Sequence, residues 1–204
     1  METKICGIKD KNTLEYISCH SYPPMFIGMV LNYSKSPRLI SINQAKKLTS
    51  LKSKCKYVAV LVSPTLKFLE SIKNLNFSYW QIYNYTPLQI KNIKKKYNKK
   101  IITALTIKNK RDVNKYKLYK NISDIILFDS KGYEKSKSFN HSLLKSVPNS
   151  ITKMLAGNIQ IKDITKFKNS PYIIDISGAL EMKKGVKDMN KIDKFLNTVH
   201  NINS

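Results

Sequence analysis

Eight short apolar runs, about one per 25 residues, are the strongest constraint on how this 204-residue chain folds. They read, in order, KICGI, MFIGMVL, KYVAVLV, FSYWQIY, IITALT, SDIILFD, TKMLAG and YIIDISG. Most are continuously apolar and do not alternate with polar residues, which is typical of parallel strands covered on both faces. The runs therefore predict eight buried strands.

The stretches between these runs carry apolar residues at helical spacing, as in INQAKKLTSL, TLKFLESIKNL and MNKIDKFLNTV. Capping or turn residues precede several of them, namely Pro64-Thr65, Pro87 and Asp188. Strand and helix thus alternate along the whole chain, and no Pro/Gly/Ser-rich linker divides it. This order predicts an α/β fold, a single (β/α)₈ TIM barrel domain spanning residues 1–204.

The predicted barrel is a minimal one, because such barrels typically need about 250 residues. A doubly wound open sheet is the competing architecture. It lacks support, since no GxGxxG motif follows the first apolar run.

The formal net charge of +24 first suggests a nucleic-acid partner. The chain has 35 lysines but only two arginines, Arg38 and Arg111, and the lysines are dispersed over its length. Arginine usually leads where bases and phosphates are read. The one dense cluster, KNIKKKYNKK at residues 91–100, predicts a solvated helix face leading into a strand. We therefore expect no nucleic-acid partner.

No apolar run reaches the 18 residues that suggest a membrane span, and the N-terminus lacks a long apolar signal segment. The three cysteines, Cys6, Cys19 and Cys55, have no repeated spacing and do not suggest a disulfide framework. These features predict a reduced, cytoplasmic protein without a membrane partner. We expect Cys19 and Cys55 to be packing residues or exposed residues without a role.

Metal and cofactor chemistry has no motif in this sequence. The histidines, His20, His141 and His200, show no ligand spacing, and neither CxxC nor HExxH occurs. A GxSxG motif is also missing. We expect neither a metal nor a cofactor.

In a (β/α)₈ barrel the chemistry gathers at the C-terminal ends of the strands. Here the polar or small residues at or near those ends are Cys6, Gln81, Asp129, Gly157, Ser177 and Gly178. They are far apart in sequence, yet one barrel mouth would bring them together.

Cys6 and Asp129 are the candidates for proton transfer. Cys6 is either a small core residue or, near an anion site, a thiol with a depressed pKa that can serve as a base. Asp129 closes a very apolar run, so it is either a loop or capping carboxylate or a partly buried general acid with a raised pKa.

Two further features suggest anion binding. Arg38, in SPR, is either a surface residue after a proline turn or a bidentate ligand for a carboxylate. LAGN at 155–158 and DISGAL at 175–180 place small residues after the seventh and eighth runs, where this fold often binds phosphate. ALEMKK at 179–184 would be the short extra helix of such a site.

The sequence resembles the phosphoribosylanthranilate isomerase family of tryptophan biosynthesis along almost its full length. The resemblance is carried, in order, by KICGIKD, IGMVLNYSKSPRLIS, VAVLVSP, LFDS, FNHSLL, LAGNI and DISGALEMKKGVKD. It implies a barrel of the ribulose-phosphate-binding type that needs no cofactor and performs an Amadori rearrangement. It also implies a small phosphorylated substrate and a monomer or homodimer.

The resemblance further implies residue roles. Cys6 would be the general base and Asp129 the general acid, while Arg38 would hold the anthranilate end of the substrate. Gln81 would be a second substrate-binding residue. The phosphate would be held by Gly157, Asn158, Ser177 and Gly178.

Some positions depart from the family pattern. Tyr83 replaces a histidine, and the usually glycine-rich loop at 131–139 contains only Gly132. Gly157-Asn158 replaces Gly-Gly, and Ser177-Gly178-Ala179 replaces Ser-Ser-Gly, so phosphate contacts would shift.

Two alternatives stay open at this point. Another sugar-phosphate barrel, such as the histidine-pathway isomerase, typically uses two aspartates, whereas the first-strand residue here is Cys6. A basic nucleic-acid-binding protein would show an affinity that falls steeply with salt.

Overall fold

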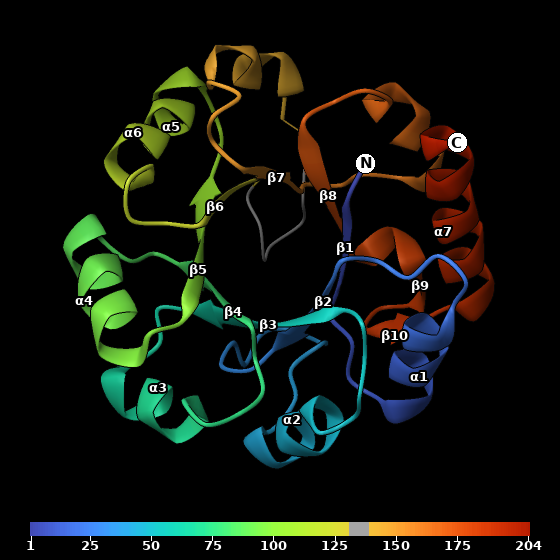
Figure 1. Ribbon diagram of the computed structural model, residues 1–204, viewed down its shortest axis with the longest axis horizontal. Coiled ribbons are helices and arrows are strands. Elements are labelled where there is room, and N and C mark those ends of the chain that lie inside the picture. Colours follow the sequence, from blue (N-terminus) through green and yellow to red (C-terminus); the bar gives the residue numbers. More distant parts are fainter. Residues whose placement is uncertain (131–138) are drawn as a thin grey trace.

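The computed structural model, which describes residues 1–130 and 139–204, is a closed barrel of eight parallel strands in sequence order, β8 pairing with β1 (Figure 1). The eight predicted strands are therefore confirmed. Their bounds are β1 Thr3–Cys6, β2 Phe26–Val30, β3 Lys56–Val62, β4 Tyr79–Tyr83, β5 Lys100–Thr106, β6 Ile125–Asp129, β7 Lys153–Leu155 and β8 Tyr172–Ile176.

The helices lie around the outside of the strand ring (Figure 1). The α-helices are α1 Lys11–Cys19, α2 Ile42–Thr49, α3 Leu66–Ile72, α4 Pro87–Tyr97, α5 Lys110–Asn114, α6 Tyr116–Tyr119 and α7 Met189–Asn203. Two 3₁₀ segments, η1 His141–Ser146 and η2 Ile161–Phe167, stand where β7 and β8 would otherwise follow full α-helices. Short connections of this kind fit eight strands into a chain of minimal length.

The residues predicted to cap or begin helices stand at the starts of observed helices. The Thr65 side chain accepts a hydrogen bond from the backbone of Phe68 at the start of α3. Pro87 is the first residue of α4 and follows the capping residue Thr86, whose side chain satisfies a backbone N–H of the first turn. Asp188 caps α7 in the same way.

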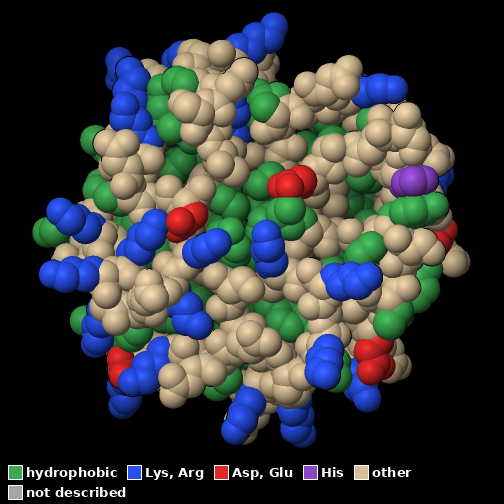
Figure 2. Space-filling model, viewed as in Figure 1, with side chains coloured by type: hydrophobic (Ala, Val, Ile, Leu, Met, Phe, Trp, Pro, Cys, Tyr) green, Lys and Arg blue, Asp and Glu red, His purple; other side chains and the backbone are tan. Residues whose placement is uncertain are grey.

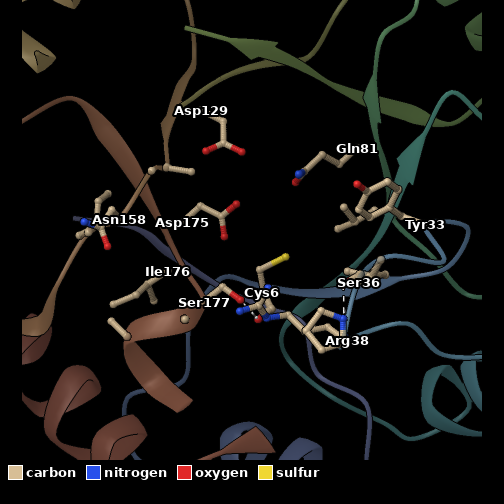
Figure 3. A pocket seen from close by; sticks show the side chains of 18 of the residues that line it. Cys6, Tyr33, Ser36, Arg38, Gln81, Asp129, Asn158, Asp175, Ile176 and Ser177 are labelled. Atoms are coloured by element: carbon tan, nitrogen blue, oxygen red, sulfur yellow. Dashed lines mark hydrogen bonds between the residues drawn. The ribbon is translucent and has the colours of Figure 1, made fainter. Parts of the chain in front are cut away.

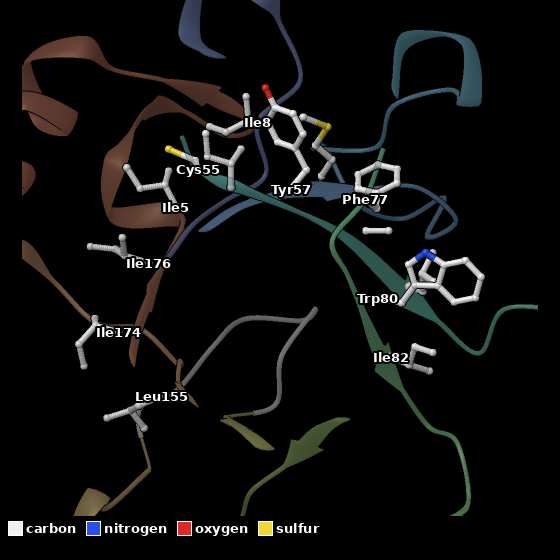
Figure 4. Close-up of a cluster of buried hydrophobic side chains, with 14 of the residues drawn as sticks. Ile5, Ile8, Cys55, Tyr57, Phe77, Trp80, Ile82, Leu155, Ile174 and Ile176 are labelled. Atoms are coloured by element: carbon white, nitrogen blue, oxygen red, sulfur yellow. The ribbon is translucent and has the colours of Figure 1, made fainter. Parts of the chain in front are cut away.

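Buried apolar side chains form two layers, which explains why the strands lack a visible alternation. Outward-facing residues such as Ile5, Trp80 and Ile82 pack in one cluster with the helices (Figure 4). Inward-facing residues such as Val58 and Leu127 form a second cluster inside the ring. Because both faces are apolar, the period of two is hidden in the sequence.

The predicted helix at 179–184 is wrong. A single 3₁₀ turn, η3 Gly178–Leu180, is followed by an antiparallel hairpin of β9 Glu181–Lys183 and β10 Val186–Lys187. Gly185 makes the turn with a φ of 80°, and its N–H donates to the Glu181 carboxylate at 3.0 Å. This local hydrogen bond and the positive φ favour a hairpin over a helix.

Lysine and arginine side chains are scattered over the visible face and do not gather on one element (Figure 2). The cluster at 91–100 forms the end of α4 and the start of β5, as predicted, and most of its lysines are exposed. In the described part of the chain, no helix has both the length and the apolar character needed to cross a membrane.

Gly185→Ala is expected to destabilise the protein by about 1–3 kcal/mol, because alanine is strained at this φ. Its Cβ would also lie 2.5 Å from the Pro37 carbonyl oxygen. Chemical unfolding measures the change. Lys183→Ala, at an exposed position of the same hairpin, is the control and should stay within about 0.5 kcal/mol of wild type. Equal stability of the two variants would contradict this account of the turn.

Candidate active site

One cavity of about 480 Å³ opens at the C-terminal ends of the strands. The structure brings all eight predicted site residues to its wall, namely Cys6, Arg38, Gln81, Asp129, Gly157, Asn158, Ser177 and Gly178. In Figure 3 the Cys6 thiol and the carboxylates of Asp129 and Asp175 point into the same space. The side chains therefore meet as the barrel topology requires.

Cys6 is the last residue of β1, and its carbonyl oxygen accepts a hydrogen bond from the Ser177 hydroxyl at 2.9 Å. Although the side chain reaches the cavity, it lies deep in the barrel mouth. Burial raises the pKa of the Cys6 thiol, and the positive charge of Lys4 opposes that rise without cancelling it. The expectation of a depressed pKa is wrong, because desolvation outweighs the nearby cations.

A buried ion pair lies beside the thiol, and the sequence analysis missed both partners. Lys4 is fully buried, and its ammonium donates to Asp175 Oδ2 at 2.7 Å. The two residues are register partners of β1 and β8. A lysine and an aspartate inside otherwise apolar strand runs were the signal, since a buried charge needs a partner.

Asp129 ends β6 with only 6% of its surface exposed. Burial raises the pKa of its carboxyl to about 7, although a hydrogen bond from the Tyr83 hydroxyl at 2.9 Å favours the charged form. The raised pKa that was expected for a general acid is therefore confirmed.

Tyr83, which the sequence analysis noted only as a departure from the family pattern, connects Asp129 to Gln81. The Gln81 side-chain amide donates to the Tyr83 hydroxyl at 3.2 Å, and that hydroxyl donates to Asp129. All three side chains are buried. The chain of hydrogen bonds fixes the orientation of the Asp129 carboxyl relative to the cavity.

Arg38 is not a loose surface residue. Its guanidinium binds Glu181 with two hydrogen bonds, from Nε at 2.5 Å and from Nη2 at 2.9 Å. Bidentate carboxylate binding was predicted, but the carboxylate here belongs to the protein itself. Glu181 was missed because its hairpin was predicted to be a helix.

Small residues shape the turns after β7 and β8, and the turn after β7 also has left-handed backbone. Gly157 has a φ of 106°, and a Cβ there would lie 2.5 Å from the Ser130 hydroxyl oxygen. Asn158 follows with a φ of 54°. Behind the second turn, the Lys187 ammonium donates to the Ser177 carbonyl at 2.9 Å. Close-approaching backbone with a buried cation nearby suits an anion.

Within residues 1–130 and 139–204, no group of three or more histidine, cysteine, aspartate or glutamate side chains could hold a metal ion. The glycine-poor loop noted at 131–139 lies, apart from Phe139, outside the described residues.

The fold and the cavity define a class, a (β/α)₈ barrel with a thiol, two carboxyls and glycine-containing turns at its mouth. The family model described as "N-(5'phosphoribosyl)anthranilate (PRA) isomerase" matches residues 3–198. The chain belongs to this family.

Individual relatives agree with the family match. The N-(5'-phosphoribosyl)anthranilate isomerase of Sulfurihydrogenibium sp. is 31% identical over 209 residues, covering 98% of this chain and 100% of the relative. The Campylobacter jejuni protein of the same name is 32% identical, with 96% and 97% covered.

Solved structures share the fold. Phosphoribosyl anthranilate isomerase from Thermotoga maritima superposes with a TM-score of 0.84 at 23% identity, covering 98% of this chain and 99% of that one. The Pyrococcus furiosus protein gives 0.80 at 24% identity, with the same coverage.

The raised pKa of Asp129 makes a prediction about stability. A carboxyl whose folded pKa is near 7, above its usual 3.8, contributes its full stability below about pH 4 and loses it as pH rises to about 7. Asp129→Asn mimics the neutral form. The variant's free energy of unfolding, relative to wild type, should therefore rise by about 2–4 kcal/mol between pH 4 and pH 8.

Urea unfolding at several pH values measures this difference. Asp163→Asn is the control, because pairing with Lys166 lowers the pKa of Asp163 and its removal should bring no gain at high pH. A pH-independent difference for Asp129→Asn would contradict the assigned burial effect.

Proposed function

We propose that the protein converts N-(5-phosphoribosyl)anthranilate to 1-(o-carboxyphenylamino)-1-deoxyribulose 5-phosphate, an isomerisation of tryptophan biosynthesis. Membership of the isomerase family over residues 3–198 supports this activity. The observation that carries it is the meeting of a thiol from β1 and a protonatable carboxyl from β6 in one cavity. An Amadori rearrangement needs one acid and one base of this kind.

Asp129 is the proposed general acid. It donates its proton to the furanose ring oxygen, the C1–O bond breaks, and the ring opens to a protonated Schiff base. A carboxyl with a pKa of about 7 keeps a substantial protonated fraction at neutral pH and can still release its proton. The Tyr83 hydroxyl, which donates to the same carboxyl, stabilises the carboxylate left behind.

Cys6 is the proposed general base. Its thiolate removes the proton from C2, the C–H electron pair forms the C1–C2 double bond, and the iminium nitrogen becomes neutral. The resulting enolamine tautomerises to the ketone. The thiol ends protonated and the Asp129 carboxylate ends charged, so both exchange protons with solvent before the next turnover.

Two anion sites hold the substrate in our proposal. The turns containing Gly157, Asn158, Ser177 and Gly178 bind the phosphate. Arg38 holds the anthranilate carboxylate with N–H groups that Glu181 does not use, since a guanidinium has five N–H donors and Glu181 accepts two hydrogen bonds. Holding both ends positions the sugar between acid and base.

We infer one domain over residues 1–204, a cytoplasmic location and a monomer or homodimer. The free state of all three cysteines supports a reducing compartment. The Thermotoga maritima relative is described as dimeric.

Purified protein mixed with freshly prepared phosphoribosylanthranilate should consume the fluorescent substrate and form the deoxyribulose product. Cys6→Ser and Asp129→Asn should each lower kcat by about 10²–10⁴-fold, because each removes one proton-transfer group. Circular dichroism should show an unchanged fold.

Cys19→Ser, at an exposed position on α1, is the matched control and should keep wild-type turnover. Folded wild-type protein that leaves the substrate untouched would refute the proposed activity. Full turnover by Cys6→Ser or Asp129→Asn would refute only the role of that residue.

A further inference from the structure

The proposed base presents a physical difficulty that the proposed function does not resolve. Burial raises the pKa of the Cys6 thiol, yet only the thiolate can remove a proton from carbon. A group that favours the charged form of sulfur must therefore stand close to it. The charged or titratable groups that influence Cys6 come from several elements and are Lys4, Arg38, Tyr83, Asp175 and Lys187.

Lys4 is the cation best placed to stabilise the Cys6 thiolate. It precedes Cys6 by two residues on β1, so both side chains point to the same inward face of the strand. Register pairs Cys6 with Gly28 on β2. A Cβ on Gly28 would lie 2.9 Å from Cys6 Sγ and 3.2 Å from Lys4 Nζ, so thiol and ammonium border the same point. The missing side chain at Gly28 leaves room for their contact.

Asp175 holds the ammonium in place. The ion pair is 2.7 Å long, and both side chains are almost completely buried. Burial alone would lower the pKa of Lys4, but Asp175 and Cys6 together hold it above its ordinary value, so the ammonium stays charged. A fixed charge in a water-poor site interacts strongly with a neighbouring sulfur.

The other two cations, Lys187 and Arg38, are hydrogen-bonded to groups in the turn and hairpin after β8. Lys187 donates to the Ser177 carbonyl and hydroxyl and lies 3.4 Å from Glu181. Arg38 is bound to Glu181 through two N–H groups. Of these three cations, only Lys4 belongs to β1, the strand that carries the thiol.

We propose that Lys4 is a positioning residue for this reaction. Its ammonium, oriented by Asp175, stabilises the Cys6 thiolate and so keeps the base able to accept the C2 proton. The thiol first loses its proton to solvent through the open cavity. The thiolate then forms the S–H bond as the C2–H bond breaks. This role rests on the proposed function, but the charge effect on the thiol exists without substrate.

The test therefore measures how readily the Cys6 thiol loses its proton, without substrate. In a Cys19→Ser background, the rate of Cys6 alkylation by iodoacetamide is followed against pH by mass spectrometry of the Cys6 peptide. Lys4→Met should move the midpoint of this profile upward by about one pH unit or more, which lowers alkylation about tenfold at a fixed pH below the midpoint. The kcat for phosphoribosylanthranilate should fall in parallel, with a smaller change in KM.

Two further variants separate the effect of the Lys4 charge on the thiol from a disturbance of the fold. Lys4→Met/Asp175→Asn removes both charges and leaves no unpaired buried carboxylate, so it serves where the single variant does not fold. It should still raise the midpoint, because Lys4 acts on the thiol more strongly than Asp175 does. Lys153→Met removes another buried lysine, whose ammonium binds the Val147 and Pro148 carbonyls, and should leave the midpoint unchanged.

An unshifted alkylation profile in the folded double variant would overturn the proposal and leave the ion pair with a structural role only. A shifted profile in a protein that never turns over phosphoribosylanthranilate would support the charge effect and refute the proposed reaction. The two failures are therefore distinguishable.

Discussion

The pairing of β8 with β1 is the constraint on which this site depends. Without it the eight strands would form an open sheet, with β1 and β6 five strand spacings apart, or roughly 24 Å. Closure of the ring arranges β1 and β6 around one cavity, so that Cys6 and Asp129 both line it. The Lys4–Asp175 ion pair joins β1 to β8, the two strands whose pairing closes the barrel. Barrel closure therefore also determines the surroundings of the thiol.

Burial in the closed barrel raises the pKa of both the proposed acid and the proposed base, with opposite consequences for their roles. It raises the pKa of Asp129 to about 7, which suits an acid that must give up a proton near neutral pH. It also raises the pKa of Cys6, which disfavours the thiolate. In both cases a neighbour opposes the effect of burial and favours the charged form. The Tyr83 hydroxyl, which accepts from Gln81, donates to the Asp129 carboxyl, and the Lys4 ammonium acts on the Cys6 thiol. In the proposed mechanism, one desolvated cavity thus supports both proton transfers.

Local sequence signals were sufficient to predict the strands, the helix starts at Thr65, Pro87 and Asp188, and the meeting of the strand-end residues in one cavity. Each of these follows from a rule that acts over a few residues or from the barrel topology. The Lys4–Asp175 pair could not be read in this way, because 171 positions separate its partners and only register joins them. The pairing of Arg38 with Glu181 depends likewise on a hairpin whose first strand, β9, was predicted to be part of a helix at 179–184. The pKa of Cys6 was misjudged because depth in the barrel outweighs the local cations.

In the proposed mechanism, acid and base stand on either side of the sugar while the two anion sites hold the ends of the substrate. A crystal structure of this protein with reduced 1-(o-carboxyphenylamino)-1-deoxyribulose 5-phosphate, which a solved relative has bound, would show whether the substrate lies in this way. We expect the carbon corresponding to C2 to lie beside Cys6 Sγ, with Asp129 toward the ring-oxygen side and the phosphate at the turns after β7 and β8. A ligand bound in reverse, with its phosphate at Arg38 and C2 turned away from Cys6, would contradict it.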